Sequence, residues 1–303
     1  MTLLNIMRVL IITGGTSSER KISLISAGEV NNALKANDHE TTLFDFKKGY
    51  PVLKKILKHY DVVFPVMHGK EGEDGVLYKF LKAAKMPYVG SDPKGANIAC
   101  NKILFKRYCD SEHLPTAPWK VIRNANNIDG FGFPCVLKAA HGGSSHEVVL
   151  IRSKKDLTSP MVKKILKLHD YFFVEQLLKG VEITVGVLHN QSLPVMEIIP
   201  PGSGWFDYKN KYSGKSREIP FAPSVTSAIQ RRAQKIALRI HKDLRLQSFS
   251  RTDFIVADGV PFILETNTPC GVGFTPKSVF PKAAKATGLS FHQMVEKILR
   301  NAI

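Results

Sequence analysis

The chain has 303 residues, 44% hydrophobic and 23% charged, which is enough apolar material for one large core or for two or three compact domains. No run approaches the roughly 18 consecutive apolar residues that a membrane-spanning helix needs, so we expect a soluble protein. The formal charge of +17 favours anionic partners, but the basic residues are scattered rather than gathered in the dense block typical of nucleic-acid binding.

The N-terminal part alternates apolar, strand-like runs with helical stretches. We predict strands at Arg8–Thr13, 41–46 and 61–66, and helices at 17–34 and 52–60. This order predicts a parallel βαβ sheet. Residues 1–13 are interrupted by Arg8 and run directly into Gly14, so we interpret them as a first strand and not as a signal peptide.

Two polar loops follow these strands. GGTSSE at 14–19 lies at a strand-to-helix junction, where ligands gather in parallel sheets, and Glu19 could bind a substrate ammonium there. Alternatively, Ser17 or Ser18 caps the helix and Glu19 is merely well placed in its first turn. His68 begins the loop HGKEGEDG, which either lines a cleft or is simply exposed.

A second unit begins after Gly90. We predict one helix over 96–111 and strands at Cys135–Ala139, 148–152 and 171–176. The glycines and serines of KAAHGGSS at 138–145 could wrap phosphate oxygens, although the lysine precedes the glycines, unlike in a Walker loop. The alternative is a structural turn.

The last part of the chain predicts strands at 182–188 and 195–199, a long helix from about 224 to 244, a hairpin turning near Asp258-Gly259, and a closing helix from Phe291 onward. Cys100, Cys109, Cys135 and Cys270 are scattered without a CxxC pair, which indicates reduced thiols in the cytoplasm and no structural zinc.

The hairpin carries polar residues within apolar strands. If residues 257–259 form a three-residue loop, Asp253 pairs with Ile263, and Glu265 and Asn267 then share the face of Asp253. Two carboxylates and an amide oxygen on one face favour a hard cation such as magnesium. A two-residue turn would instead place Asp253 on the face opposite to Glu265 and Asn267. The alternative function-free interpretation is an ordinary amphipathic hairpin with a solvated face.

Taken in order, these segments resemble the D-alanine:D-alanine ligase family of the ATP-grasp superfamily, from about Arg8 to Leu299. The matching pieces are GGTSSERKIS, HGKEGEDG, PYVGSD, LPTAPW, VLKAAHGGSS, VEQLLKGVEITVGVL, WFDYKNKY, SRTDF, ILETNT and SVFPKAAKATGLSF. The resemblance implies an ATP-grasp fold of three α/β domains, which we place at 1–93, 94–178 and 179–303.

The resemblance also implies roles for individual residues. Those expected to bind ATP are Lys102, Lys138, Ser145 and Lys211 at the phosphates, Glu175 and Leu178 at the adenine, and Glu182 at the ribose. Those expected to hold two Mg²⁺ ions, replaceable by Mn²⁺, are Asp253, Glu265 and Asn267. Those expected to bind or activate the amino acids are Glu19 at the first ammonium, Ser144 and Tyr212 linking it to a closing loop, His68 nearby, Arg251 and the Gly271 N–H at the oxyanion, and Ser278 at the second carboxylate.

The implied reaction joins two D-alanine molecules through an acyl phosphate, for peptidoglycan precursor synthesis. The resemblance further implies a cytoplasmic homodimer whose substrates are ATP and D-alanine, with no nucleic-acid or membrane partner.

The sequence departs from the family pattern in two loops. Ser145 is followed by His146 and Glu147 instead of a small apolar residue and glycine, and the segment from Asn267 to Ser278 is longer than usual. If the chain uses an amino-acid pair other than D-alanine, these departures point to 146–147 and 270–274 as the determinants. One alternative is an ATP-grasp ligase for another amino-acid pair, and a second is a non-catalytic nucleotide sensor. A third, a basic nucleic-acid-binding protein, rests only on the charge of +17.

Overall fold

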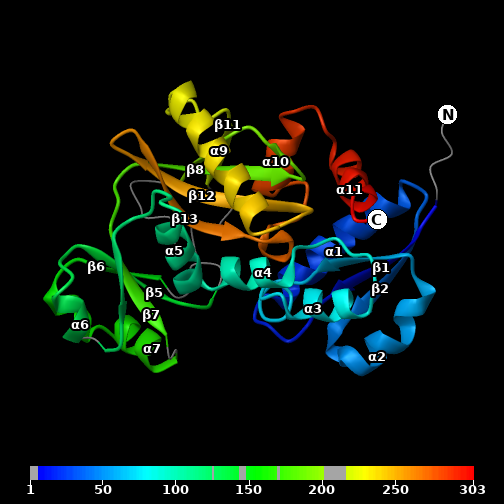
Figure 1. The fold of residues 1–303 in the computed structure, drawn as a ribbon, viewed down its shortest axis with the longest axis horizontal. Helices are drawn as coiled ribbons and strands as arrows, with labels where there is room; N and C mark the ends of the chain where they lie inside the picture. Colours follow the sequence, from blue (N-terminus) through cyan, green and yellow to red (C-terminus); the bar gives the residue numbers. More distant parts are fainter. Residues whose placement is uncertain (1–5, 125, 143–147, 169–170, 201–215) are drawn as a thin grey trace.

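The computed structural model describes residues 6–124, 126–142, 148–168, 171–200 and 216–303. Three β-sheets with flanking helices follow one another along the chain (Figure 1). The expected α/β class with a parallel N-terminal βαβ sheet is confirmed.

The first sheet is parallel, in the order β2-β1-β3. Side chains alternate along its central strand, so Val9 and Ile11 join one hydrophobic core while Leu10 and Ile12 join another on the opposite face. Burial on both faces explains why β1 and β3 are largely apolar, whereas β2, at the edge of the sheet, is more polar. Its elements are β1 (Arg8–Thr13), α1 (Arg20–Lys35), β2 (Glu40–Asp45), α2 (Gly49–Ile56), β3 (Val62–Val66) and α3 (Val76–Ala83).

The second sheet is antiparallel, in the order β4-β7-β5-β6. Helix α7 packs Val162 and Ile165 against one face of it, beside Leu137 and Val174. Its elements are β4 (Trp119–Ile122), α6 (Asn126–Asp129), β5 (Cys135–Ala139), β6 (Val148–Ile151), α7 (Pro160–Leu168) and β7 (Phe172–Gln176).

The third sheet is antiparallel, in the order β11-β10-β8-β12-β13, with β9 beside β8. On β8, Ile183 and Val185 face the core under α9, whereas Glu182 and Thr184 line a cleft on the other side. Its elements are β8 (Val181–Leu188), β9 (Gln191–Ser192), β10 (Met196–Ile199), β11 (Arg217–Pro220), α9 (Ser227–Asp243), β12 (Phe249–Ala257), β13 (Val260–Asn267), α10 (Val279–Lys285) and α11 (Phe291–Arg300).

The single helix predicted over 96–111 is wrong, because the segment forms two helices, α4 (Pro93–Cys100) and α5 (Lys102–Ser111). Asn101 leaves helical geometry with φ −90° and ψ 105°, and its side chain accepts hydrogen bonds from the N–H groups of Ile103 and Leu104. An asparagine that caps a new helix in this way interrupts an otherwise helical pattern.

Other predicted boundaries shift by a few residues. The helix predicted over 52–60 begins at Gly49 and ends at Ile56, followed by a 3₁₀ turn, and the helix predicted from residue 17 begins at Arg20.

Helix α11 at the C-terminus packs on the N-terminal sheet, beside α1 (Figure 1). Its buried face carries Met294, Val295, Ile298 and Leu299. Polar contacts support the docking: the Met7 N–H donates to His39 Nδ1 at 3.1 Å, and His39 Nε2 lies 2.9 Å from Glu296 Oε2. The two ends of the chain therefore share one core.

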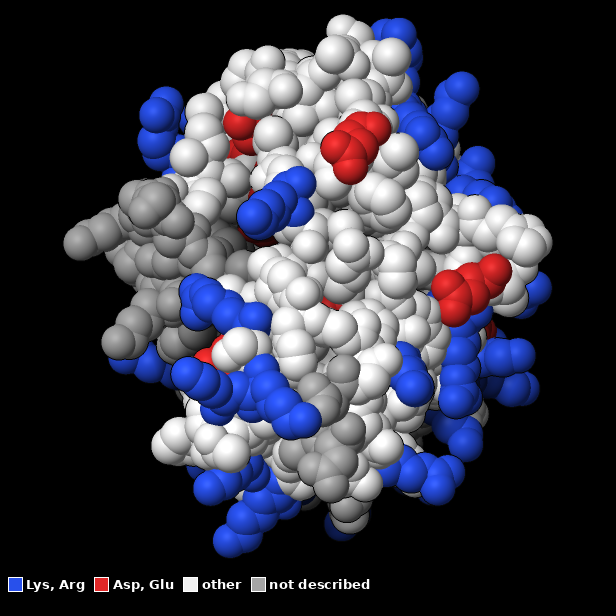
Figure 2. Space-filling model, turned by 90° about the vertical axis from the view of Figure 1, so that its left-hand side faces the viewer, with Lys and Arg blue, Asp and Glu red and all other residues white. Residues whose placement is uncertain are grey.

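Lys and Arg side chains are spread over the face drawn in Figure 2, with few acidic side chains among them. Helix α7 contributes to the basic surface of the protein, because its Lys163, Lys164 and Lys167 are exposed. Among the helices of the described ranges, none is long and apolar enough to cross a membrane.

Leu299→Ala should destabilise the protein by about 2–5 kcal/mol, because Leu299 is fully buried where α11 meets the N-terminal sheet and truncation leaves a cavity. Urea unfolding followed by circular dichroism measures the change. Lys285→Ala, at an exposed position of α10, should stay within about 0.5 kcal/mol of the wild type. Equal losses in the two variants would contradict this packing role.

Candidate active site

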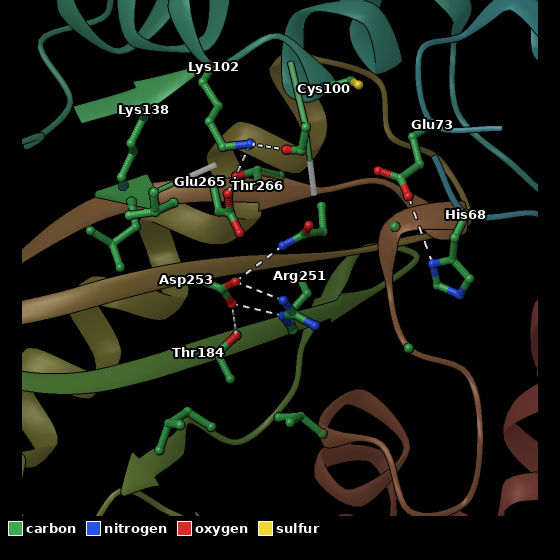
Figure 3. Close-up of a pocket in the computed structure, with 18 of the residues that line it drawn as sticks. His68, Glu73, Cys100, Lys102, Lys138, Thr184, Arg251, Asp253, Glu265 and Thr266 are labelled. Carbon is green, nitrogen blue, oxygen red and sulfur yellow. Dashed lines mark hydrogen bonds and ion pairs between the residues drawn. The ribbon is translucent and has the colours of Figure 1, made fainter. Parts of the chain in front are cut away.

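A cleft of about 2000 Å³ lies where the three sheets meet. Its walls come from the loops after β1 and β3, from the central sheet around β5 and β7, and from β8, β12 and β13. Figure 3 shows Arg251, Asp253 and Glu265 in this space, with Lys102 and Lys138 on one side of them and His68 and Glu73 on the other.

The hairpin β12–β13 has a register that the sequence did not predict. Ala257 pairs with Val260, so the turn has only two residues, Asp258 and Gly259, both with positive φ as in a type I′ turn. Asp253 therefore pairs with Glu265 and not with Ile263, which corrects the three-residue loop.

A β-bulge restores the face that the shorter turn would have lost. Between Asp253 and Phe254 the pairing partner changes from Glu265 to Ile263, so Leu264 is an extra residue on β13. Arg251 pairs with Asn267 in the same register. The expected shared face of Asp253, Glu265 and Asn267 is thus confirmed through a different geometry, and all three line the cleft.

Asp253 is held on three sides. Arg251 donates to both of its carboxylate oxygens at 2.8 Å, and Asn267 Nδ2 donates at 3.2 Å. The hydroxyl of Thr184, from the neighbouring strand β8, donates to Asp253 Oδ1 at 2.5 Å. These contacts fix the orientation of the carboxylate in the cleft (Figure 3).

The donor set on this face fits a hard divalent cation. Asp253 and Glu265 supply carboxylate oxygens and Asn267 an amide oxygen, which are the ligands that magnesium prefers. The ammonium of Lys102 lies 3.6 Å from Glu265 Oε2 and also donates to the Gly142 carbonyl at 2.7 Å. The face is therefore suited to bind metal and phosphate side by side.

Lys138 and Glu175 form an ion pair of 2.5 Å between β5 and β7. A second lysine, Lys106 of α5, lies 2.6 Å from the other oxygen of Glu175. Burial disfavours the charge of Glu175, but the two ammonium groups outweigh it and hold the pKa of this carboxyl below its usual range. The sequence interpretation missed Lys106, because a lysine within an amphipathic helix gives no signal that it is buried.

The loop after β1 positions Glu19 at the N-terminal end of α1. Neither Ser17 nor Ser18 caps this helix: Glu19 itself is the N-cap residue, without a side-chain capping bond, and Ser17 Oγ instead donates to the His68 carbonyl at 2.8 Å. The alternative that Glu19 lies in the first turn is therefore wrong. Its side chain lines the cleft.

His68 is buried, not an exposed loop residue. Its N–H donates to Ser23 Oγ at 2.9 Å, and its Nδ1 lies 3.8 Å from Glu73 Oε1. Burial lowers the pKa of His68, so the imidazole is neutral at physiological pH.

Glu73 is a second residue that the sequence interpretation missed. Its Oε1 accepts a hydrogen bond from the Gly69 N–H at 2.7 Å. Burial, together with the negative charge of Glu19, raises the pKa of Glu73 to about 7. A polar loop does not reveal such a shift, which depends on a carboxylate from another element.

The segment after β13 bears on two expectations. The Gly271 N–H, expected at the oxyanion, donates to the Thr268 carbonyl at 2.8 Å. Cys270, Val272 and Phe274 are at most 2% exposed, form core contacts and do not line the cleft, so the influence of 270–274 on substrate choice stays a prediction. Residues of this segment that do line the cleft are Gly271, Gly273, Thr275 and Ser278.

The remaining expected residues divide into two groups. Leu178, Glu182 and Ser278 line the cleft, and Ser278 Oγ lies 3.0 Å from Thr275 Oγ1. Those that lie outside the described residues are Ser144, Ser145, His146, Glu147, Lys211 and Tyr212.

Comparisons with known proteins cover nearly the whole chain. Residues 51–91 match the D-ala D-ala ligase N-terminus family, and residues 110–300 match the D-ala D-ala ligase C-terminus family. The D-alanine–D-alanine ligase of Maridesulfovibrio salexigens is 33% identical over 297 residues, and that of Syntrophobacter fumaroxidans is 36% identical over 306 residues; each match covers 97% of both chains.

Solved structures of D-alanine–D-alanine ligases are also similar to this chain over nearly its whole length. A crystal structure of D-alanine–D-alanine ligase from Bacillus anthracis is 29% identical with a TM-score of 0.86, and one complexed with ATP is 27% identical with a TM-score of 0.85. Each covers 98% of this chain and 97% of its own.

Glu73→Gln should stabilise the protein at pH 8 but not at pH 5. The folded state raises the pKa of Glu73 to about 7, so its favourable contribution is complete below the pKa of an unfolded glutamate and is lost as pH rises through about 7. Glutamine removes that loss above pH 7, and the melting temperature should then exceed that of the wild type by a few degrees. Exposed Glu40→Gln is the control, and an equal shift at both pH values would contradict the assignment.

Proposed function

The chain belongs to the D-alanine–D-alanine ligase family, and on that basis we propose that it is an ATP-dependent ligase that joins two D-alanine molecules into D-alanyl-D-alanine. The observation that carries this proposal is the cleft face of the hairpin, where Arg251, Asp253, Glu265 and Asn267 lie together, with Lys102 of α5 and Lys138 of β5 beside them. A non-catalytic nucleotide sensor would have no need for this combination of residues.

ATP would lie between the second and third sheets. Lys102 and Lys138 line the cleft and supply positive charge for the phosphates, Glu175 and Leu178 lie where the chain passes from one sheet to the other, and Glu182 follows on β8. Lys211 and Ser145 complete the expected set by resemblance alone. A similar D-alanine–D-alanine ligase was solved in complex with ATP, which supports ATP as the nucleotide.

Asp253, Glu265 and Asn267 would hold the magnesium ions. When bound, magnesium supplies positive charge to the phosphate oxygens and favours transfer of the γ-phosphoryl group. Thr184 keeps the Asp253 carboxylate in place for this task through its hydroxyl. The number of ions and the use of Mn²⁺ rest on the resemblance.

The first D-alanine would bind with its ammonium at Glu19, near the neutral His68, with Ser144 and Tyr212 joining from the loop expected to close the site. Its carboxylate attacks the γ-phosphorus of ATP, the bond to ADP breaks, and an acyl phosphate forms. The amine of the second D-alanine, its carboxylate at Ser278, then attacks the acyl carbon. The C–N bond forms, the C–O bond breaks, inorganic phosphate leaves and the attacking nitrogen loses a proton.

Positioning and charge neutralisation provide most of the catalysis in such a sequence. The negative charge that develops on the carbonyl oxygen would be met by the Arg251 guanidinium, which already lies in the cleft. The Gly271 N–H could assist only if its 2.8 Å bond to Thr268 lengthens, so we assign the main contribution to Arg251.

A second candidate function is a ligase of the same mechanism that joins another pair of amino acids. The specific observation is the longer segment after Asn267, whose residues Gly271, Gly273 and Thr275 form part of the cleft wall. We retain D-alanine because family members match over the whole chain. The cytoplasmic location, the homodimer, and domains at 1–93, 94–178 and 179–303 remain predictions from the resemblance.

Glu265→Gln should lower turnover by at least about 100-fold and weaken metal binding, because a charged metal ligand becomes a neutral amide of the same size. Mn²⁺ binding measured by electron paramagnetic resonance separates the metal effect from activity. Circular dichroism should show an intact fold, and Glu112→Gln is the exposed control. Wild-type Mn²⁺ affinity in Glu265→Gln would rule out this ligand.

Arg251→Ala should reduce kcat by about 100- to 1000-fold while ATP affinity changes little, since the guanidinium acts on charge that appears during the reaction. Steady-state kinetics and calorimetric ATP titration measure the two effects. Arg239→Ala, at an exposed ion pair with Glu112, should behave like the wild type. A loss confined to ATP binding would reassign Arg251 to the nucleotide.

A further inference from the structure

Lys106 is among the largest fully buried side chains of the described residues, with 1% of its surface exposed. It belongs to α5, and its ammonium lies 2.6 Å from Glu175 Oε2. It also donates to Thr116 Oγ1 at 2.5 Å, and that hydroxyl in turn donates to the Ile263 carbonyl of β13 at 3.1 Å. Burial lowers the pKa of Lys106, while the adjacent Glu175 carboxylate raises it, so an ammonium at this position needs a reason.

Glu175 is shared between two lysines. Its Oε1 contacts Lys138 at 2.5 Å and its Oε2 contacts Lys106 at 2.6 Å, and the carboxylate itself is 3% exposed. Two cations around one anion leave a net charge of +1, although a single lysine would neutralise the carboxylate. Lys138 also feels the negative charges of Glu265 and Glu182, so the two lysines are not equivalent, and the burial of Lys106 beside Glu175 needs its own explanation.

The two lysines differ in what else they can reach. Lys138 lines the cleft and keeps 13% of its side chain exposed, whereas Lys106 is not among the residues lining the cleft and keeps 2% of its side chain exposed. Thr116, in the connection between α5 and β4, also holds the ammonium of Lys106 through its hydroxyl. Lys138 is therefore the lysine of this pair that faces the cleft, where a ligand would lie.

We propose that Lys106 is a positioning residue: it is the permanent counter-ion of Glu175, and it thereby frees Lys138 to move its ammonium from Glu175 to a phosphate oxygen of ATP. This inference rests on the proposed function, because it concerns the same nucleotide site. Lys106 touches neither ATP nor amino acid and acts only through Glu175.

The physical reason is the cost of a lone buried charge. If Lys138 were the only partner, its transfer to ATP would leave a buried carboxylate unpaired, and that penalty would be subtracted from the binding energy of the nucleotide. With Lys106 in place, Glu175 keeps an ion pair throughout. The ammonium of Lys138 then supplies the positive charge that pairs with the phosphate.

Lys106→Met tests this directly. Glu175 still has Lys138 in this variant, so no unpaired buried charge arises and we expect it to fold; Lys106→Gln serves as a second, polar variant. ATP affinity measured by calorimetry should fall at least about tenfold in both, since Lys138 is retained by Glu175. Adenosine, which has no phosphate, should bind within about twofold of its wild-type affinity. Lys120→Met, an exposed lysine on β4, is the matched control.

A double variant separates this role from simple packing. Once Glu175→Gln removes the carboxylate, adding Lys106→Met should cause no further loss of ATP affinity, because no counter-ion is needed. Additive losses, an equal loss for adenosine and ATP, or unchanged ATP affinity in both Lys106 variants would each overturn the inference. If the wild-type chain itself bound no ATP, the proposed function would fail, and this inference with it.

Discussion

The register of the hairpin β12–β13 is the constraint on which the site depends. A two-residue turn at Asp258 and Gly259 would by itself place Asp253 and Glu265 on opposite faces, and only the extra residue Leu264 brings them back together. The bulge lies directly beside the charged pair. One backbone irregularity therefore determines whether the cleft contains a cluster of oxygen ligands or an ordinary amphipathic strand.

Positively and negatively charged side chains are concentrated in this cleft, and two of its carboxylates are held by neighbouring side chains. Asp253 is held by Arg251 and Thr184, while Glu175 is held by Lys106 and Lys138. The supports come from strands and helices, which hold groups more precisely than loops do. A preorganised site of this kind can neutralise phosphate charge without rearranging the fold.

Much of the fold could be predicted from periodicity, since the apolar strands of the first sheet and the closing helix at Phe291 coincide with what forms. Local patterns failed where one side chain redirects the backbone, as at Asn101, or where a bulge alters parity. The burial of Lys106 and the raised pKa of Glu73 depend on groups far away in the sequence, so no local pattern contains them. Residue roles came from the resemblance. The convergence of oxygen ligands was predicted from strand alternation with a three-residue turn, but it is produced by a two-residue turn and a bulge.

The most direct test is phosphate release from ATP and Mg²⁺ with D-alanine as the only amino acid, with the product identified by mass spectrometry. Our account predicts one phosphate released for each D-alanyl-D-alanine formed. A panel of other D- and L-amino acids, singly and in pairs, should react poorly. Phosphate release only with another pair would contradict the assigned substrate, and no release with any pair would contradict the ligase itself.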